Sequence, residues 1–475
     1  MQLSSILAST YTDRQLPPKK LDWLITGTAV VLTAVLFLRF AGDGLHAYFT
    51  ADDVMNLYTA VFRPVTDWQR PSSSAFYRVI FDAFGLQPLP YRVACYALLI
   101  ANLALLWAVC RRLSGSLEVA GVAIILAAYH AHLADLYYST GTIVDILCFF
   151  FYFAALWLYM RTRQRSAAWI FAVFALYAGA LAAKEIAATL PVLLLLYDLL
   201  YYPPGSRAGA VRWAAREAMR LALFVVPTVA VAYLKTAGSS RVTVNPDFMP
   251  TFSWQVFSGN WRHYAHDLFY GASDFHGWRI VALWVAVVAL AAVLRRRDAW
   301  IAAAICLIGI LPVAFIPERG FYAVYVTLPG WYLLAARTLT TGRERLLPRA
   351  GAWDAVGLLV VLALGLAAVH ARQKPRGMAW VAAEHDSVRR TLEPLRRYVL
   401  PPKAEVLVTA DPYDPNDSIL LGIFRLRFRD PDITVRRVAA RPGEHYDAVF
   451  TYASPAPGVP SALVRASDPE TGTRQ

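Results

Sequence analysis

Long runs of apolar residues, separated by short tracts rich in Lys and Arg, constrain this chain more than any other feature of its sequence. Each run is about 16–22 residues long, close to the length that an α-helix needs to cross the hydrocarbon core of a bilayer. Hydrophobic residues make up 57% of the 475 residues and charged residues only 17%. An average soluble protein has about 25% charged residues. The pattern predicts an α-helical, multi-pass membrane protein.

Eleven runs of this kind predict eleven transmembrane helices. The first run follows Lys19 and Lys20 and is too long for the core of a signal peptide. We therefore interpret it as a retained helix. The predicted spans are residues 22–40, 91–110, 118–136, 143–160, 167–183, 186–202, 221–234, 280–294, 299–316, 322–338 and 352–370.

Basic residues between the apolar runs predict the orientation of the chain. With the N-terminus inside, six tracts rich in Lys and Arg all fall on the cytoplasmic side, as the positive-inside rule requires. Because most Lys and Arg lie in these tracts, the net charge of +13 does not indicate a nucleic-acid partner. We expect a protein of the cytoplasmic (inner) membrane, among membrane lipids. After eleven spans its C-terminus lies outside, on the periplasmic side.

Two long outside loops interrupt the predicted membrane domain, which covers residues 1–371. The loops are residues 41–90 and residues 235–279. In the second loop, apolar residues recur at helical spacing over Ser253–Tyr270. This spacing predicts a helix that lies at the membrane interface.

The composition changes after His370, and residues 372–475 are soluble in character. We expect them to form a small α/β domain outside the membrane. An amphipathic pattern predicts a helix over Met378–Val399, with Val399 on its apolar side. The other predicted elements are strands at 405–410, 433–438 and 446–452, a helix from 417 to 428, and a disordered C-terminal end.

Two adjacent carboxylates, Asp52 and Asp53, follow the first apolar run on its outside end. A carboxylate just outside the hydrocarbon suits a general base acting on an acceptor hydroxyl, or a ligand of a divalent cation. The structural alternative is a helix N-terminus, because Thr50 precedes a sequence that favours a helix through Phe62. The sequence leaves these interpretations open.

Four further charged clusters fall on the same predicted side of the membrane. An arginine fork there either binds phosphate oxygens or anchors a helix at the interface. A carboxylate inside the membrane boundary is costly unless it is paired or functional. A Lys beside a Glu either neutralises its neighbour or faces an anion. The clusters are Arg70, Asp145, Lys184 with Glu185, and Glu318 with Arg319.

In their order along the chain, these motifs are similar to those of the membrane-embedded type C glycosyltransferases. The resemblance is to the protein O-mannosyltransferase-like branch, which includes the tetratricopeptide-repeat O-mannosyltransferases. It covers roughly residues 20–340, and its most specific stretch is Ala183-Lys-Glu-Ile-Ala-Ala-Thr-Leu-Pro191. The other matching stretches are Asp52-Asp53, Arg70-Pro71, Phe84–Arg92, Arg112–Ser116, Ser139–Asp145 and Pro317–Arg319 with Tyr322 and Tyr325.

The resemblance implies a sugar donor linked to a polyprenyl phosphate and an exported acceptor, which is a protein, a lipid or a glycan. Transfer of the hexosyl or pentosyl group is expected to invert the anomeric carbon. The family's first-loop aspartate, the expected base, maps to Asp52 or Asp53, and we favour Asp52. The lipid-linked sugar is a co-substrate, no cofactor is certain, and a divalent metal on the two aspartates stays open. Candidate residues for the donor phosphate or substrate are Arg70, Arg92, Asp145, Lys184, Glu185, His263, Glu318 and Arg319.

The sequence also departs from the family pattern. Tyr91 and Arg92 stand where many members of that family carry a histidine, and Ser139–Thr142 replaces a more usual Gly-Arg-Ala ahead of the aspartate. No tetratricopeptide array is present in the sequence. Two alternatives therefore stay open: a polyprenyl-lipid or sugar transporter or flippase, and a non-catalytic membrane scaffold of the same fold. Charges gathered at one membrane face disfavour the transporter, which needs them near the midplane.

Overall fold

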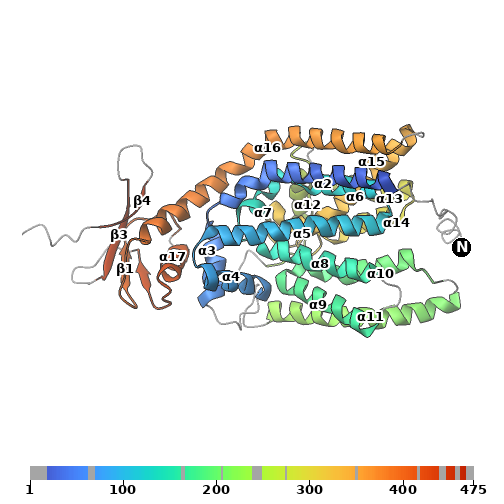
Figure 1. The fold of residues 1–475 in the computed structure, drawn as a ribbon. Helices are drawn as coiled ribbons and strands as arrows, with labels where there is room; N and C mark the ends of the chain where they lie inside the picture. The colour runs from blue at the N-terminus through green and yellow to red at the C-terminus, as the bar shows by residue number, and fades with distance from the viewer. Residues whose placement is uncertain are drawn as a thin grey trace, which may run out of the picture.

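The computed structural model describes residues 19–62, 70–161, 166–204, 207–237, 249–272, 275–347, 351–414, 418–437, 446–454 and 461–466. These residues form a bundle of long helices with a small β-sheet beyond one end of it (Figure 1). The first described helix begins at the opposite end of the bundle, where the ribbon is darkest blue. We refer to the end that faces the sheet as the sheet end.

Most of the described chain is helical. The helices of the bundle are α2 (Lys19–Ala41), α5 (Pro88–Ser114), α6 (Leu117–Ala127), α8 (Ile143–Arg161), α9 (Ala167–Ala183), α10 (Leu190–Tyr201), α11 (Arg207–Ala237), α13 (Trp278–Leu294), α14 (Arg297–Ile308), α15 (Leu328–Leu346) and α16 (Ala352–Leu395). Shorter helices are α3 (Ala51–Phe62), α4 (Pro71–Phe84), α7 (Ala134–Tyr138) and α12 (Trp254–Leu268). The 3-10 helices are η1 (Gly42–His46), η2 (Ala131–Leu133), η3 (Glu185–Thr189) and η6 (Phe321–Thr327).

Among the described residues, four helical stretches are long and apolar enough to cross a membrane. A fifth is obtained if α6 and the η2–α7 segment, which are bent by 63° at their junction, count as one span. The prediction of eleven spans is therefore not confirmed. The four stretches are Asp22–His46, Pro88–Ser114, Ile143–Arg161 and Ala352–Met378.

Two of the predicted spans, 167–183 and 280–294, form apolar helices of only 17 residues, and three others are broken by irregular turns. The predicted span 186–202 begins with η3, which leaves α10 only 12 residues. At 1.5 Å per residue, α10 is about 18 Å long, well short of a bilayer core of about 30 Å. The predicted span 322–338 likewise begins with η6, and the predicted span 118–136 contains the 63° bend. Hydropathy alone does not detect such breaks.

The described residues of the two loops that the sequence predicted to be outside include helices. Helix α3 ends at Phe62, as expected, and begins with a capping box in which Thr50 Oγ1 accepts from Asp53 N at 3.2 Å. In return, Asp53 Oδ2 accepts from Thr50 N at 3.0 Å. The helix predicted over Ser253–Tyr270 is present as α12, and Ser253 Oγ caps it by accepting from Val256 N at 3.2 Å.

Helix α16 runs across residue 371 without interruption and is 44 residues long. It joins the last predicted span to the predicted amphipathic helix, and it leads out of the bundle toward the sheet (Figure 1). Val381, Val388 and Leu392 are buried along its outer half, as the amphipathic pattern predicts. The prediction is wrong for Val399, which lies beyond the end of α16 and is 89% exposed.

The C-terminal region is a small α/β unit. Its sheet has the order β2-β1-β3-β4, with β1 parallel to both neighbours and β4 antiparallel to β3. The three predicted strands are present, and β4 is a fourth strand that the sequence did not predict. The elements are β1 (Glu405–Val408), α17 (Ile419–Phe428), β2 (Thr434–Arg436), β3 (Ala448–Ala453) and β4 (Ala462–Arg465). The residues predicted to be disordered lie mostly outside the described residues.

Helix α17 connects this unit to the bundle. On one side, the Phe424 ring packs 5.6 Å from the Phe450 ring of β3. On the other side, Arg425 Nη1 donates to the Tyr58 hydroxyl of α3 at 2.7 Å. The α/β unit therefore rests on the helix that carries Asp52 and Asp53.

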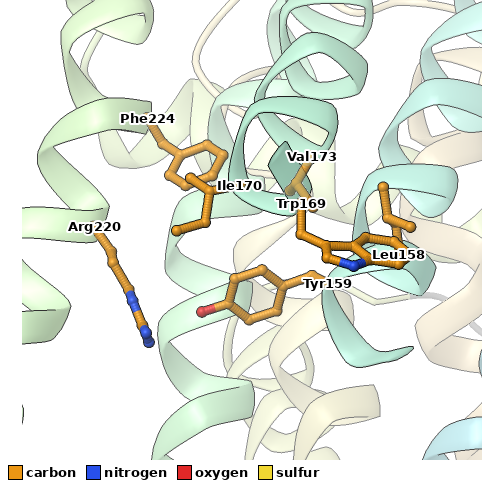
Figure 2. A pocket seen from close by; sticks show the side chains of 7 residues that line it. All are labelled: Leu158, Tyr159, Trp169, Ile170, Val173, Arg220 and Phe224. Carbon is orange, nitrogen blue, oxygen red and sulfur yellow. The ribbon is translucent and has the colours of Figure 1, made fainter. Parts of the chain in front are cut away.

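A small gap lies between α8, α9 and α11, lined mainly by apolar side chains around Tyr159, Trp169 and Phe224 (Figure 2). Its volume is about 10 Å³, which is the space of about one water molecule. The gap is a packing feature and is too small for a substrate.

We expect Gly330→Ala to destabilise the bundle, because α14 and α15 cross at this glycine. A Cβ atom at residue 330 would lie 2.7 Å from the Ala302 carbonyl oxygen and 2.8 Å from Ile305 Cβ. Overpacking of this kind costs about 1–3 kcal/mol. Thermal unfolding in detergent measures the loss. Gly357→Ala in α16, where a new Cβ meets nothing within 4 Å, is the matched control and should unfold like the wild type.

Candidate active site

A cavity of about 490 Å³ collects most of the charged clusters that the sequence singled out. Its walls come from α3, the residue before α4, the α7–α8 loop, the α9–η3 junction, α11 and the turn before η6. The polar side chains that line it are Asp52, Asn56, Arg70, Asp135, Ser139, Thr142, Asp145, Lys184, Glu185, Thr228, Arg319 and Tyr322. Six of the ten candidate residues are in this set; the four that do not line the cavity are Asp53, Arg92, His263 and Glu318.

Asp53 is completely buried in the wall behind the cavity. Its Oδ2 lies 3.0 Å from Arg92 Nη2. Its Oδ1 accepts from Ser139 Oγ at 2.8 Å and from the Gly141 backbone N–H at 2.6 Å. Both carboxylate oxygens are thus occupied by protein donors. Asp53 holds the start of α3 against the α7–α8 loop, and it is poorly placed to contact a substrate or a cation.

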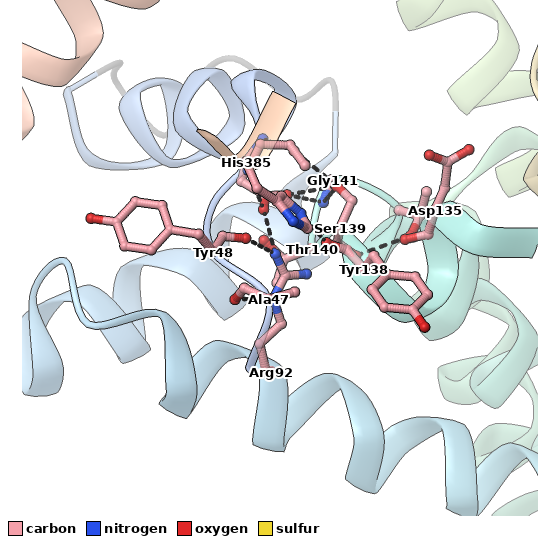
Figure 3. A network of polar contacts seen from close by, with 12 residues as sticks. Ala47, Tyr48, Arg92, Asp135, Tyr138, Ser139, Thr140, Gly141 and His385 are labelled. Carbon is pink, nitrogen blue, oxygen red and sulfur yellow. Dashed lines mark hydrogen bonds and ion pairs between the residues drawn. The ribbon is translucent and has the colours of Figure 1, made fainter. Parts of the chain in front are cut away.

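Arg92 is the counter-charge of Asp53 and is 1% exposed. Its Nε donates to the Ala47 carbonyl oxygen at 3.3 Å, and its Nη2 donates to the Tyr48 carbonyl oxygen (Figure 3). These contacts join the first turn of α5 to the segment between η1 and α3. The Arg92 guanidinium is therefore part of the scaffold behind the site.

Asp52 lines the cavity, although Asp53 next to it faces the protein interior. Successive residues of a helix point about 100° apart, so two adjacent aspartates separate in this way. Gly141 makes room for the side chain, because a Cβ at residue 141 would lie 3.1 Å from Asp52 Cβ. Asn56 lies one turn further along α3 and lines the same cavity.

Lys184 and Asp145 form a buried ion pair at the cavity wall. Lys184 Nζ bonds to Asp145 Oδ1, and the two side chains are 8% and 1% exposed. Lys184 has extended backbone angles between α9 and η3, and its ammonium lies 5.4 Å from the centre of the Tyr322 ring. The charge inside the predicted membrane boundary is therefore paired, as its cost requires.

Arg319 lines the cavity, whereas Glu318 beside it has a 62% exposed side chain. His263 of α12 supports this turn from behind. Its Nε2 lies 3.1 Å from the Arg319 carbonyl oxygen, and its Nδ1 lies 3.3 Å from Glu318 Oε1. His263 thus contacts the turn that carries Arg319 and does not line the cavity.

Sequence reasoning missed several residues around the cavity. Asn56 was detectable, since it is four residues after Asp52 on a predicted helix, and Asp135 and Tyr322 lie next to motifs already identified. Glu384 and His385 gave no signal, because they belong to the outer half of α16. His385 Nε2 lies 2.8 Å from the Tyr138 carbonyl oxygen. Figure 3 labels both residues. Burial raises the pKa of Glu384, and the charges of Asp52 and Asp53 raise it further.

A metal site is not apparent in the described part of the chain. No group of three or more His, Cys, Asp and Glu side chains there is arranged to hold a metal ion. At the acidic pair, Asp53 has both oxygens bonded to protein donors, which leaves Asp52 as the carboxylate that reaches the cavity.

We expect Arg92→Met to lower the free energy of unfolding, because it leaves the Asp53 carboxylate buried without its counter-charge. Removing one partner of a buried ion pair costs about 3–5 kcal/mol. Arg436→Met, which breaks a 3.8 Å contact to Glu405 between half-exposed side chains, is the control and should cost about 0–1 kcal/mol. Thermal unfolding compares the two variants. Equal losses would show that the Asp53 network is not critical for stability.

We expect His385→Gln to flatten the pH dependence of stability. Burial, followed by the charge of Arg92, lowers the pKa of His385 below its ordinary value of 6.5. The unfolded chain therefore binds more protons than the folded chain once the pH falls below 6.5, so the wild type loses stability there. Thermal unfolding of both proteins across this pH window measures the effect. The same slope in wild type and variant would contradict it.

Two solved structures of one protein share this fold. The crystal structure of ArnT from Cupriavidus metallidurans bound to undecaprenyl phosphate matches with a TM-score of 0.57 and 13% identity, over 94% of this chain and 99% of that one. The apo state of the same ArnT matches with a TM-score of 0.54 and 15% identity, over 92% and 97%. No family model and no curated protein matches the sequence. The chain therefore has the fold of ArnT, a membrane-embedded type C glycosyltransferase.

Proposed function

We propose that this protein is a glycosyltransferase that moves a sugar from a polyprenyl-phosphate donor to an acceptor on the outer side of the membrane. The observation that carries the proposal is the composition of one cavity. A carboxylate, Asp52, lines it together with the cations Arg70, Lys184 and Arg319. Transfer from a lipid phosphate needs these two kinds of group, a base for the acceptor and cations for the leaving phosphate.

In this proposal Asp52 is the base. It takes the proton of the acceptor hydroxyl while the acceptor oxygen forms a bond to the anomeric carbon of the sugar. The bond from that carbon to the phosphate oxygen breaks, and the polyprenyl phosphate leaves with the bonding electrons. Attack from the face opposite the phosphate inverts the anomeric carbon. Asp53 is excluded from this role because both of its oxygens already accept hydrogen bonds.

The cations are proposed to hold the phosphate as its negative charge increases. Arg70 offers a planar fork that suits two phosphate oxygens at once. The ion pair with Asp145 orients Lys184, so its ammonium is already positioned when the phosphate binds. Arg319 is held by the His263 contact to its own carbonyl oxygen. Preorganised donors of this kind stabilise developing charge without rearrangement.

The apolar part of the cavity is suited to the lipid. Val231 and Ala232 of α11 lie on one wall, and Pro312, Val313 and Ile316 lie on another. We propose that the first isoprene units pack between these walls. The likeness to ArnT supports a lipid-linked donor, because that protein was crystallised with undecaprenyl phosphate. We propose no particular sugar, and the structural neighbours described here give no support to the O-mannosyltransferase branch.

The proposed orientation places the sheet end of the bundle outside the cytoplasmic membrane, with the N-terminus inside. The positive-inside pattern supports it, because Arg111, Arg112 and Arg343 lie at the ends of helices away from the sheet end. The cavity then opens where an exported acceptor arrives.

We expect Asp52→Asn to reduce sugar transfer by about 10²–10⁴-fold, the usual contribution of general-base catalysis, and to leave the protein folded. The measurement is the transfer of radiolabelled sugar from a polyprenyl-phosphate donor to the exported acceptor fraction in membranes. Asp43→Asn is the matched control, since Asp43 lies near the same end but pairs with Lys374 at 2.7 Å outside the cavity lining.

Wild-type transfer by the Asp52→Asn protein would refute the assignment of the base. Absence of transfer by the wild type with every lipid-linked sugar tested would refute the proposed function. A strain that lacks the protein should accumulate the lipid-linked donor, which also identifies the sugar.

A further inference from the structure

A second hollow, separate from the Asp52 cavity, lies on the C-terminal unit. It is an open groove of about 690 Å³ between the segment that follows α16 and the turn that follows α17. The two hollows share no lining residue. The groove is lined by Tyr398, Val399, Leu400, Pro401, Pro402, Lys403, Arg427, Phe428, Arg429, Asp430 and Ile433.

The groove has more positive charge than its own carboxylate neutralises. Asp430, its one lining carboxylate, accepts from the backbone N–H groups of Lys403 at 2.7 Å and Asp432 at 2.8 Å. The Lys403 ammonium lies 3.1 Å from Asp432 Oδ2. Arg427 and Arg429 have no carboxylate partner among the described residues. The two guanidinium groups are therefore available to an anion.

Arg427 is the more constrained of the two arginines. Its Nη2 donates to the Arg396 carbonyl oxygen at 3.0 Å. Its Nε–H is buried and has no hydrogen-bond partner in the part of the chain that the structure describes. Burial and the nearby charge of Arg396 lower the pKa of Arg427. The Arg427 guanidinium therefore has fewer acceptors within the described protein than it has N–H donors.

The position of the groove indicates where the anion comes from. The Arg429 guanidinium lies 5.0 Å from the centre of the Phe81 ring in α4. Arg396 Nη2 donates to the Leu86 carbonyl oxygen at 3.3 Å, and the candidate span α5 begins two residues later, at Pro88. The groove therefore lies beside the end of a membrane span.

Exposed apolar side chains accompany the arginines at this position. Phe84 is 50% exposed, Leu89 is 53% exposed, and Val399 in the groove wall is 89% exposed. Apolar side chains that enter the head-group region, next to arginines that reach phosphates, are typical of a surface lying on an anionic membrane.

We propose that this groove binds the phosphate of an anionic lipid head group in the leaflet next to the sheet end, and so fixes the C-terminal unit on the membrane. Arg427 and Arg429 contact the phosphate, and Val399 enters the apolar region beside it. The unit is coupled to the cavity through the Arg425 bond to Tyr58 of α3. The groove therefore holds the helix that carries Asp52 at a set height above the bilayer.

The test uses the full chain in nanodiscs of phosphatidylcholine, alone or mixed equally with phosphatidylglycerol. Backbone hydrogen exchange is measured over residues 398–403 and 427–433. We expect exchange to slow in the mixed discs, with each arginine contributing about fivefold, and the effect to weaken as salt is added. Arg427→Gln and Arg429→Gln should each remove part of the slowing. Arg436→Gln, on a strand outside the groove, should retain all of it.

Three other results of the hydrogen-exchange experiment would contradict the proposal. Slowing produced by inorganic phosphate in phosphatidylcholine discs, to the same extent as by phosphatidylglycerol, would assign the groove to a soluble anion. The absence of slowing in mixed discs would show that it binds no lipid. Slowing that persists in both arginine variants would place the lipid contact elsewhere. If Arg427→Gln does not fold, as judged by thermal unfolding, the exposed Arg429 carries the test.

Discussion

The buried ion pair between Asp53 and Arg92 is the interaction on which the candidate site depends. It joins the start of α5, the segment before α3 and the α7–α8 loop at one point that solvent does not reach. Because the pair is buried, the loss of either partner would leave an uncompensated charge inside the protein, which is costly. Because Asp53 is fixed on this side of α3, the neighbouring Asp52 is fixed on the other side, in the cavity wall.

The sequence predicted those parts of the structure that depend on local pattern. Apolar runs and basic tracts identified a helical membrane protein, and charged turns identified Lys184 and Arg319. The sequence did not predict that Asp53 is buried in an ion pair while Asp52 lines the cavity. That difference depends on the Arg92 guanidinium, 39 residues further along the chain than Asp53. Glu384 and His385 were missed for a related reason, since their proximity to the site depends on the packing of α16 against the end of α7 at Tyr138.

Three of the predicted spans are broken where the chain forms the cavity. Each broken span is interrupted beside the cavity, at η3 with Glu185, at η6 with Tyr322, and in the η2–α7 segment with Asp135. Irregular backbone at membrane depth is tolerated where it lines a polar cavity, because the freed N–H and C=O groups find partners there. A hydropathy profile treats these segments as continuous helix because the breaks contain few polar residues. In a chain of this type, a short span flanked by one charged pair is therefore an indication of a site.

Because α16 is one continuous helix, the number of its residues determines how the residues beyond it are rotated about the helix axis. Successive residues of an α-helix are rotated by about 100° around its axis. Inserting or deleting a single residue between His370 and Glu384 would turn Glu384 and His385 away from the α7–α8 loop, with no substitution in either side chain. The same change would rotate the sheet and the Arg427–Arg429 groove about the helix axis. An insertion or deletion in this helix should therefore disturb the site as much as a substitution of a residue that contacts it.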